Sequence, residues 1–162
     1  MMKSILFTLP FLFIPVLFGF NEIPANFFTV GKNSYSLSAF HLVNESYSIK
    51  SKFEIDLMTE KEDLAKAKTY LYFSVTGDNT AKLSNGIYQF SSGALNDRLP
   101  FQFNGYAKIN DHLVKITEGT ISLENKKGEY DIHFILKLQN GDIAKGTYRG
   151  KAIEADRSRA YK

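Results

Sequence analysis

Two carboxylates, Glu54 and Asp56, are the side chains in this sequence best placed for acid and base chemistry. They stand two residues apart in a segment that alternates polar and apolar residues, so both project from one face of a strand. Two carboxyl groups on one face could hydrolyse a glycosidic bond, one protonating the leaving oxygen and the other acting as nucleophile or base. The pattern is equally typical of a solvated strand face, which is the interpretation we favour.

Tyrosines form a second group of candidates. The chain has 9 Tyr, 14 Phe and no Trp. Tyrosine joins an apolar ring to a polar hydroxyl, which suits it to a ligand pocket or a protein interface. Tyr70 and Tyr72 share the strand face opposite Leu71 and Phe73. We predict a ligand or partner surface formed by four residues: Tyr70, Tyr72, Tyr88 and Tyr106.

The sequence lacks the patterns of common metal, cofactor and nucleophile sites. The chain has no cysteine, which excludes disulfides, thiol catalysis and cysteine-based zinc sites. Its histidines, His41, His112 and His133, are not at metal-ligand spacing. There is no Gly-x-Ser-x-Gly elbow, phosphate-binding glycine loop or His-Glu-x-x-His helix. We therefore expect no metal, no cofactor and no catalytic residues.

The charge pattern bears on possible partners. Lysines and arginines are interleaved with acidic residues along the chain, and the formal net charge is +3. Nucleic-acid binding usually requires a basic stripe or a high density of positive charge. We expect no nucleic-acid partner, which leaves a small molecule, a glycan or a protein.

The elements that must position these side chains are β-strands. Segments after the first twenty residues alternate apolar and polar side chains with period two and end in Gly, Asn, Asp or Ser. A capping-box pattern at Thr59 and Glu62 favours one short helix over 60–67. The predicted strands are 27–31, 34–43, 47–58, 69–76, 86–91, 101–109, 113–123, 129–138 and 143–153.

The last hairpin turns at Gln139-Asn140-Gly141, and its register follows from its side chains. A two-residue turn would force Arg149 onto the apolar face, which is costly if that face is buried. A three-residue loop ending in a left-handed glycine instead places Phe134 opposite Gly146, where the glycine leaves space for the ring. It also pairs Asp131 with Arg149 on the other face. We therefore predict the three-residue loop.

Short hairpin connections and glycines inside strands indicate an all-β fold. Glycines such as Gly146 and Gly150 allow an antiparallel sheet to bend strongly. We predict an antiparallel meandering β-barrel of the calycin-like type, with a two-layer β-sandwich as the alternative. It forms one domain over 21–155, followed by a flexible tail over 156–162.

The first twenty residues have the pattern of a secretory signal peptide. Lys3 precedes an apolar run, Ile5–Phe20, that Pro10 and Pro15 interrupt. A membrane-spanning helix needs about 20 apolar residues, more than this run provides. We expect export to the periplasm, the cell surface or the medium, with membrane contact only through this segment if it stays uncleaved.

Several strand and turn segments carry a resemblance to a group of known proteins. The chain resembles small exported β-proteins of uncharacterised function from Bacteroidetes-type bacteria, both at its opening segment, 28–37, and in its carboxy-terminal half. Those relatives are often lipoproteins, but this chain has no cysteine to acylate. Calycins are a looser architectural parallel, and their Gly-x-Trp signature is absent here. The carboxy-terminal segments are Gly119-Thr120-Ile121-Ser122-Leu123, Gly128-Glu129-Tyr130-Asp131-Ile132, Asn140-Gly141-Asp142-Ile143 and Gly146-Thr147-Tyr148-Arg149-Gly150.

These observations favour an exported binding or adhesion module without catalytic activity. Its ligand would be a small apolar molecule, a glycan or a protein partner. The first alternative is a carbohydrate hydrolase that uses Glu54 and Asp56. The second is a structural subunit of the cell envelope, which would show a long unpaired edge strand and little concavity.

The signal-peptide interpretation makes a direct prediction about the mature protein. We expect protein recovered from the exporting cell to begin between residues 20 and 27, because Ala25 is the best small residue for a cleavage site. Intact-mass measurement checks this start. A full-length species that is extracted only with detergent would show that the segment persists as a membrane tether.

Overall fold

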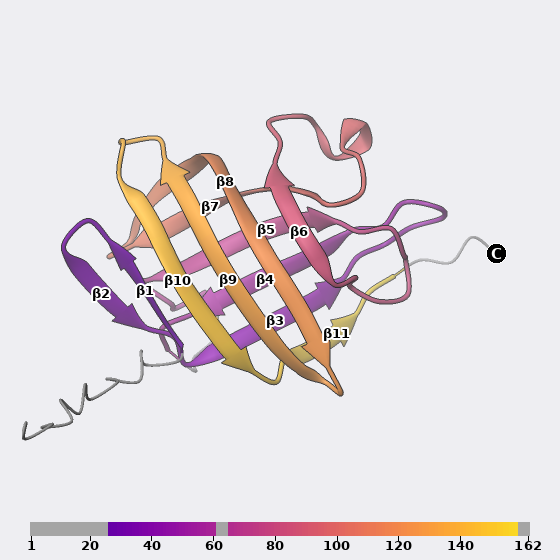
Figure 1. Cartoon of the computed structure of the whole chain (residues 1–162), viewed down its shortest axis with the longest axis horizontal. Coiled ribbons are helices and arrows are strands. Elements are labelled where there is room, and N and C mark those ends of the chain that lie inside the picture. The colour runs from indigo at the N-terminus through magenta and orange to yellow at the C-terminus, as the bar shows by residue number, and fades with distance from the viewer. Residues whose placement is uncertain (1–25, 61–64, 159–162) are drawn as a thin grey trace, which may run out of the picture.

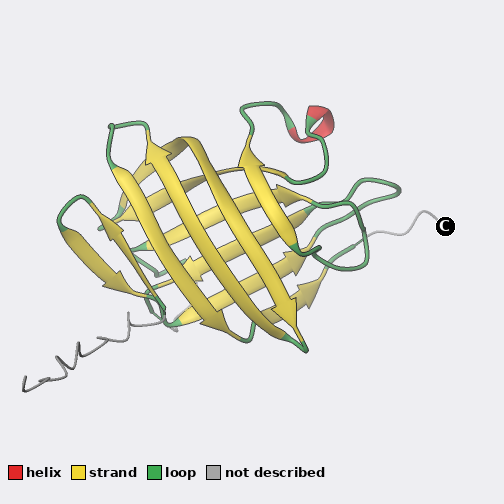
Figure 2. Cartoon of the chain, in the orientation of Figure 1, coloured by secondary structure: helices red, strands yellow, loops and turns green. Residues whose placement is uncertain are grey.

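The computed structural model describes residues 26–60 and 65–158, which fold into an all-β domain. Figure 2 shows strands and loops with one short helical turn, η1 (Leu95–Asp97). No helix in these two ranges is long and apolar enough to cross a membrane. The strands are β1 (Phe27–Val30), β2 (Asn33–Ser36), β3 (Ala39–Asn44), β4 (Phe53–Met58), β5 (Tyr70–Thr76), β6 (Gly86–Phe90), β7 (Gln102–Ile109), β8 (His112–Lys126), β9 (Glu129–Leu138), β10 (Ile143–Gly150) and β11 (Ile153–Asp156).

All of these strands belong to one curled sheet. Its order is β11-β3-β4-β5-β7-β6-β8-β9-β10-β1-β2, and β7 also pairs directly with β8. The pairs are antiparallel except β11 with β3 and β6 with β7. Because the sheet curls, β6, β8, β9 and β10 lie across β3, β4, β5 and β7 as a second layer (Figure 1). The predicted all-β, barrel-like fold is confirmed.

The long strand β8 belongs to both layers. Its first residues pair with β7, from Ile109 with His112 to Tyr106 with Lys115. Its later residues pair with β9, and the register shifts between Ile116 and Glu118. A bulge bends a strand and increases its twist, so β8 turns away from β7 at this point. The strand β6 occupies the fork, pairing with β7 on one side and β8 on the other.

Aromatic rings fill the space between the layers. Phe40 of β3 packs edge-on against Tyr130 and Tyr148, with ring centroids 5.0 and 5.6 Å apart. These contacts join the two ends of the curled sheet through side chains. Phe73 of β5 likewise contacts Phe134 of β9 across the interior, at 6.1 Å. These ring contacts connect the two layers through the main core cluster.

The last hairpin has the predicted register. Phe134 lies opposite Gly146, and Asp131 lies opposite Arg149, which donates a hydrogen bond to it through Nε at 3.2 Å. The loop closes with the Leu138 N–H donating to the Asp142 carbonyl at 2.9 Å. The third loop residue, glycine 141, has φ +90°, the left-handed conformation that the three-residue loop requires.

Several predicted strand bounds are wrong in an informative way. The segment 34–43 divides at residues 37–38 into β2 and β3, and 143–153 divides at residues 151–152 into β10 and β11. Both breaks occur where the chain passes from one edge region of the sheet to the other. The segment 47–58 is a strand only from Phe53, because Tyr47 and Lys50 form an isolated bridge within a tight turn.

The predicted helix over 60–67 falls partly on residues 61–64, which lie outside the described residues. Residues 65–67 form a turn and irregular backbone rather than the end of a helix. The turn places Ala67 against Met58 and Tyr70 in a small apolar cluster, separate from the main core.

Substitution of Gly146 tests the packing of β10 against β1 and the register of the last hairpin. Its Cα lies so close to β1 that an added Cβ would be 2.6 Å from the Phe28 Cβ and would collide with the Phe27 carbonyl oxygen. The space is thus taken by β1 as well as by Phe134. We expect Gly146→Val to destabilise the domain by about 1–3 kcal/mol, because the obstruction is largely backbone. Thermal and urea unfolding measure the loss.

The matched control is Lys145→Val, which places the same side chain on the exposed face of β10. We expect this change to be nearly neutral because valine is a good strand former. An unchanged or raised melting temperature for Gly146→Val would contradict the register and the assigned core face of β10.

Candidate functional site

A row of functional side chains crosses the outer face of β3, β4, β5, β7 and β8. Opposite residues in adjacent strands share a face, and the ladder aligns one residue from each strand. The row reads His41, Asp56, Tyr72, Tyr106 and Lys115. The curled sheet therefore brings an imidazole, a carboxyl group, two phenols and an ammonium group to one surface.

Three of the four predicted tyrosines meet on this face. The rings of Tyr72 and Tyr106 are stacked, with centroids 4.9 Å apart and planes inclined by 26°. The hydroxyl groups of Tyr70 and Tyr106 lie 3.3 Å apart, within hydrogen-bond distance. Burial is the main cause that raises the pKa of Tyr72 and of Tyr106, so both phenols stay protonated at neutral pH.

The structure places Tyr88, the fourth predicted tyrosine, elsewhere. Its side chain is in the main core and is 0% exposed. Its hydroxyl donates to the Ser84 carbonyl at 2.7 Å, which satisfies the polar tip of the ring. Because β6 is short and only partly alternating, its inward face could not be assigned from the sequence.

An open cleft of about 580 Å³ adjoins the stacked tyrosines. It lies where β7 and β8 diverge, and its aromatic walls are Tyr72, Tyr106 and Phe90. Opposite them is the bulged part of β8, with Ile116 at the base. The volume is within the range of small-molecule pockets, about 300–1,000 Å³.

Polar side chains complete the lining of this cleft. They are two amides, Asn104 and Gln139, two hydroxyls, Ser92 and Thr117, and one ammonium group, Lys115. The Thr117 hydroxyl donates to the Lys137 carbonyl at 3.2 Å, so its lone pairs remain available as acceptors. A ligand with apolar faces and several hydroxyl or carbonyl groups would match this mixture.

Glu54 lies beside the row and has its own partners. Lys52 donates to the Glu54 Oε1 at 2.8 Å, and the Tyr72 hydroxyl donates to the same oxygen at 3.0 Å. Lys52 also forms an ion pair with Glu45. Hydrogen bonding to Lys52 is the main cause that lowers the pKa of Glu45. The hydrogen bond to Glu54 restrains the Tyr72 hydroxyl, and Lys52 in turn restrains Glu54.

Asp56 is nearly buried, at 5% exposure, and its Oδ1 has no hydrogen-bond partner among the described residues. The facing His41 also has an unpartnered atom, Nε2. Burial first, and then the charge of Glu54, raises the pKa of Asp56 from 3.8 to about 7. Asp56 is thus an acid that changes charge near neutral pH, and such shifts are common at functional sites.

The Arg98 side chain contacts the neighbouring row of residues on this face, in which Ser74 is opposite Asn104. It is 7% exposed, and it donates to the Ser74 hydroxyl at 2.9 Å and to the Asn104 Oδ1 at 3.4 Å. Its guanidinium also contacts the Ser74 carbonyl oxygen. No carboxylate among the described residues forms an ion pair with Arg98. Burial lowers the pKa of this guanidinium, which nevertheless remains charged.

Sequence reasoning did not identify Asn104, Lys115 or Arg98 as site residues. The position of Lys115 could have been predicted from the hairpin turn between β7 and β8, which Asn110-Asp111 forms. Both turn residues have positive φ, +50° and +69°, as a two-residue hairpin loop requires. Counting back from that turn pairs Lys115 with Tyr106. Arg98 comes from an irregular loop, and no period in the sequence indicates where it lies.

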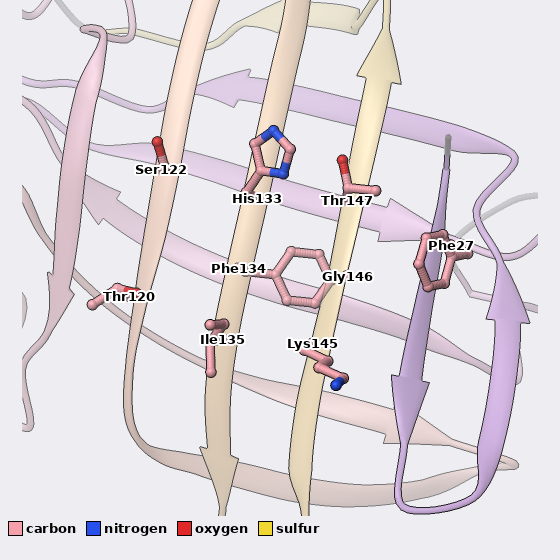
Figure 3. Close-up of a pocket in the computed structure, with 9 residues that line it drawn as sticks. All are labelled: Phe27, Thr120, Ser122, His133, Phe134, Ile135, Lys145, Gly146 and Thr147. Carbon is pink, nitrogen blue, oxygen red and sulfur yellow. The ribbon is translucent and has the colours of Figure 1, made fainter. Parts of the chain in front are cut away.

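A second hollow, of about 440 Å³, lies on the outer face of β8, β9, β10 and β1. Figure 3 shows Ser122, His133 and Thr147 across neighbouring strands, with Ile135 and Lys145 beyond them. This hollow is open and shallow, and it contains none of the predicted tyrosines. The His133 Nε2 lies 2.9 Å from the Asp131 Oδ1.

Within residues 26–60 and 65–158, no group of three or more His, Cys, Asp or Glu side chains is arranged to hold a metal ion. Comparisons with protein-family models, curated proteins and solved structures found no match to this chain. The case for a function therefore depends on the geometry of the cleft.

The raised pKa of Asp56 predicts a pH-dependent stability. A carboxyl group whose folded pKa lies above its unfolded value stabilises the fold at low pH, and this contribution is lost as the pH rises through the folded value, here about 7. We expect the melting temperature to fall as the pH rises from about 4, near the ordinary pKa of this acid, to about 7, and to level off above that, with a total effect of at most ~4 kcal/mol.

Asp56→Asn resembles the protonated acid and cannot ionise. We expect this variant to be more stable than the natural protein at the higher pH and to show a flatter pH profile. The control is Glu129→Gln, at an exposed carboxylate of β9, which should leave the profile unchanged. An Asp56→Asn profile as steep as that of the natural protein would contradict the assignment.

Proposed function

We propose that this protein is an exported binding module that holds a saccharide in the cleft between β7 and β8, without catalysing its hydrolysis. The single observation that carries the proposal is the pairing of stacked rings, Tyr72 and Tyr106, with an amide and hydroxyl lining in one open cleft. Export is part of the same proposal and is inferred from the signal-peptide pattern of the first twenty residues.

The chemistry of the lining supports a saccharide over a purely apolar ligand. A sugar ring has an apolar face of C–H groups, which packs on an aromatic ring, and a rim of hydroxyls, which exchange hydrogen bonds with amides and hydroxyls. The lining of the cleft contains both kinds of partner. An apolar ligand would cover the Asn104 NH₂ group and the Gln139 amide without offering them hydrogen bonds, which costs binding free energy.

Hydrolysis is the second candidate, and the raised pKa of Asp56 is the observation that favours it. A carboxyl group that titrates near pH 7 can act as a general acid at neutral pH. However, neither Asp56 nor Glu54 lines the cleft, and Asp56 is nearly buried. The Glu54 Oε1 already accepts two hydrogen bonds. Binding without hydrolysis therefore fits the geometry better.

A structural role in the envelope has less support. Such a subunit would present a long unpaired edge strand for addition of another chain. The edge strands of the described sheet, β2 and β11, have four residues each. Short edges of this kind limit strand addition, and the clefts supply concavity that a purely structural subunit does not need.

The test is binding of short neutral and acidic oligosaccharides to the purified mature domain, by array screening and then calorimetry. We expect Tyr72→Leu and Tyr106→Leu each to weaken binding of a saccharide hit by about tenfold, because leucine keeps the bulk and removes the flat ring face. The matched control is Tyr35→Leu, at a tyrosine of β2 that stacks on Phe28 and not at the cleft.

Three outcomes would overturn the proposal. A hit whose affinity is unchanged by both cleft variants would place the site elsewhere on the protein. Release of shorter saccharides by the natural protein, abolished in Asp56→Asn, would establish the hydrolase instead. If no saccharide binds at all, the proposed function fails.

A further inference from the structure

We infer that the saccharide held by this cleft is anionic, bearing a carboxylate or sulfate group that Lys115 and Asn104 bind. The inference rests on the proposed function and goes further by naming the chemical class of the ligand. It follows from three features: an ammonium group without an ion-pair partner, an amide oriented as a donor, and a buried arginine without an acidic partner among the described residues.

Lys115 projects from β8 on the same face as Tyr106, its opposite residue in β7. It is exposed, lines the cleft and forms no ion pair with any described residue. An ammonium group beside two aromatic rings can attract an anionic substituent while the sugar ring packs on the rings. Lys115 is the charged residue of the cleft lining.

Arg98 fixes the orientation of the second donor. Its guanidinium donates to the Asn104 Oδ1, and guanidinium groups cannot accept hydrogen bonds, so the Asn104 oxygen must face Arg98. The Asn104 NH₂ group is therefore turned away from Arg98 and is available as a donor. A buried cation behind this amide also makes the local potential positive.

Lys115 and Arg98 are the cations near the cleft that have no acidic partner among the described residues. Two nearby carboxylates already have cationic partners: Glu54 shares Lys52 with Glu45, and Glu118, beside the bulge, is bound by Lys137 at 2.7 Å. An anionic group of a ligand bound beside Lys115 would supply the acidic partner that this ammonium group lacks.

The experiment compares matched pairs of ligands that differ in charge. The first pair is tetragalacturonate and its methyl ester, and the second is a sulfated carrageenan tetrasaccharide and its desulfated form. Calorimetry on the mature domain measures each affinity at low and at physiological salt. We expect at least one anionic member to bind tenfold or more tightly than its neutral partner, and the two pairs distinguish a carboxylate from a sulfate ligand.

Lys115→Met is the decisive variant, because methionine retains the apolar stem and removes the charge. We expect this variant to lower the affinity for the anionic ligand at least tenfold and to change the affinity for the neutral ligand less than twofold. Lys145→Met is the matched control, since it removes an exposed lysine of β10 outside this cleft and alters the net charge equally. Far-ultraviolet circular dichroism confirms that both variants fold.

The outcomes separate this inference from the proposed function. Equal binding of the charged and neutral members, or an unchanged anionic affinity in Lys115→Met, overturns the inference and leaves saccharide binding in place. An equal loss in Lys145→Met would show nonspecific attraction and would also overturn it. If neither class of ligand binds, the proposed function and this inference fail together.

Discussion

The structure depends on one constraint, the divergence of β8 from β7 at the bulge between Ile116 and Glu118. Before the bulge β8 extends the layer of β5 and β7, and after it β8 carries β9 and β10 across the other side. A single sheet can thus enclose its own apolar face, which is how an antiparallel sheet buries a core without helices. The same divergence interrupts the pairing of β7 with β8, and the cleft occupies that interruption.

Aromatic rings lie on both faces of the curled sheet. Phe40, Phe73 and Tyr130 make ring contacts across the space between the layers. Large aromatic side chains also appear on the outer face, where Tyr72 and Tyr106 stack. Rings inside give stability through burial, and rings outside, beside polar groups, give a surface for recognition.

Local periodicity predicted much of this fold because most strands alternate cleanly and pair with their sequence neighbours. The register of the last hairpin followed from keeping Arg149 off the apolar face. Periodicity could not show that the segment 34–43 leaves one edge of the sheet and re-enters at the other, because alternation continues through the crossing. Of the four tyrosines named from the sequence, Tyr70, Tyr72 and Tyr106 converge because they share one strand face, whereas Tyr88 faces inward. Arg98 comes from an irregular loop, whose side-chain positions no period in the sequence indicates.

The raised pKa of Asp56, in the row across the outer face, has an energetic explanation. A charged Asp56 would be costly at 5% exposure beside Glu54, and the cost is reduced when the acid keeps its proton to about pH 7. Glu54, by contrast, accepts hydrogen bonds from Lys52 and Tyr72. The hydrogen bond from the Tyr72 hydroxyl to Glu54 restrains the end of the Tyr72 ring, while stacking on Tyr106 restrains its face. The orientation of this ring is therefore set by two independent contacts, one polar and one aromatic.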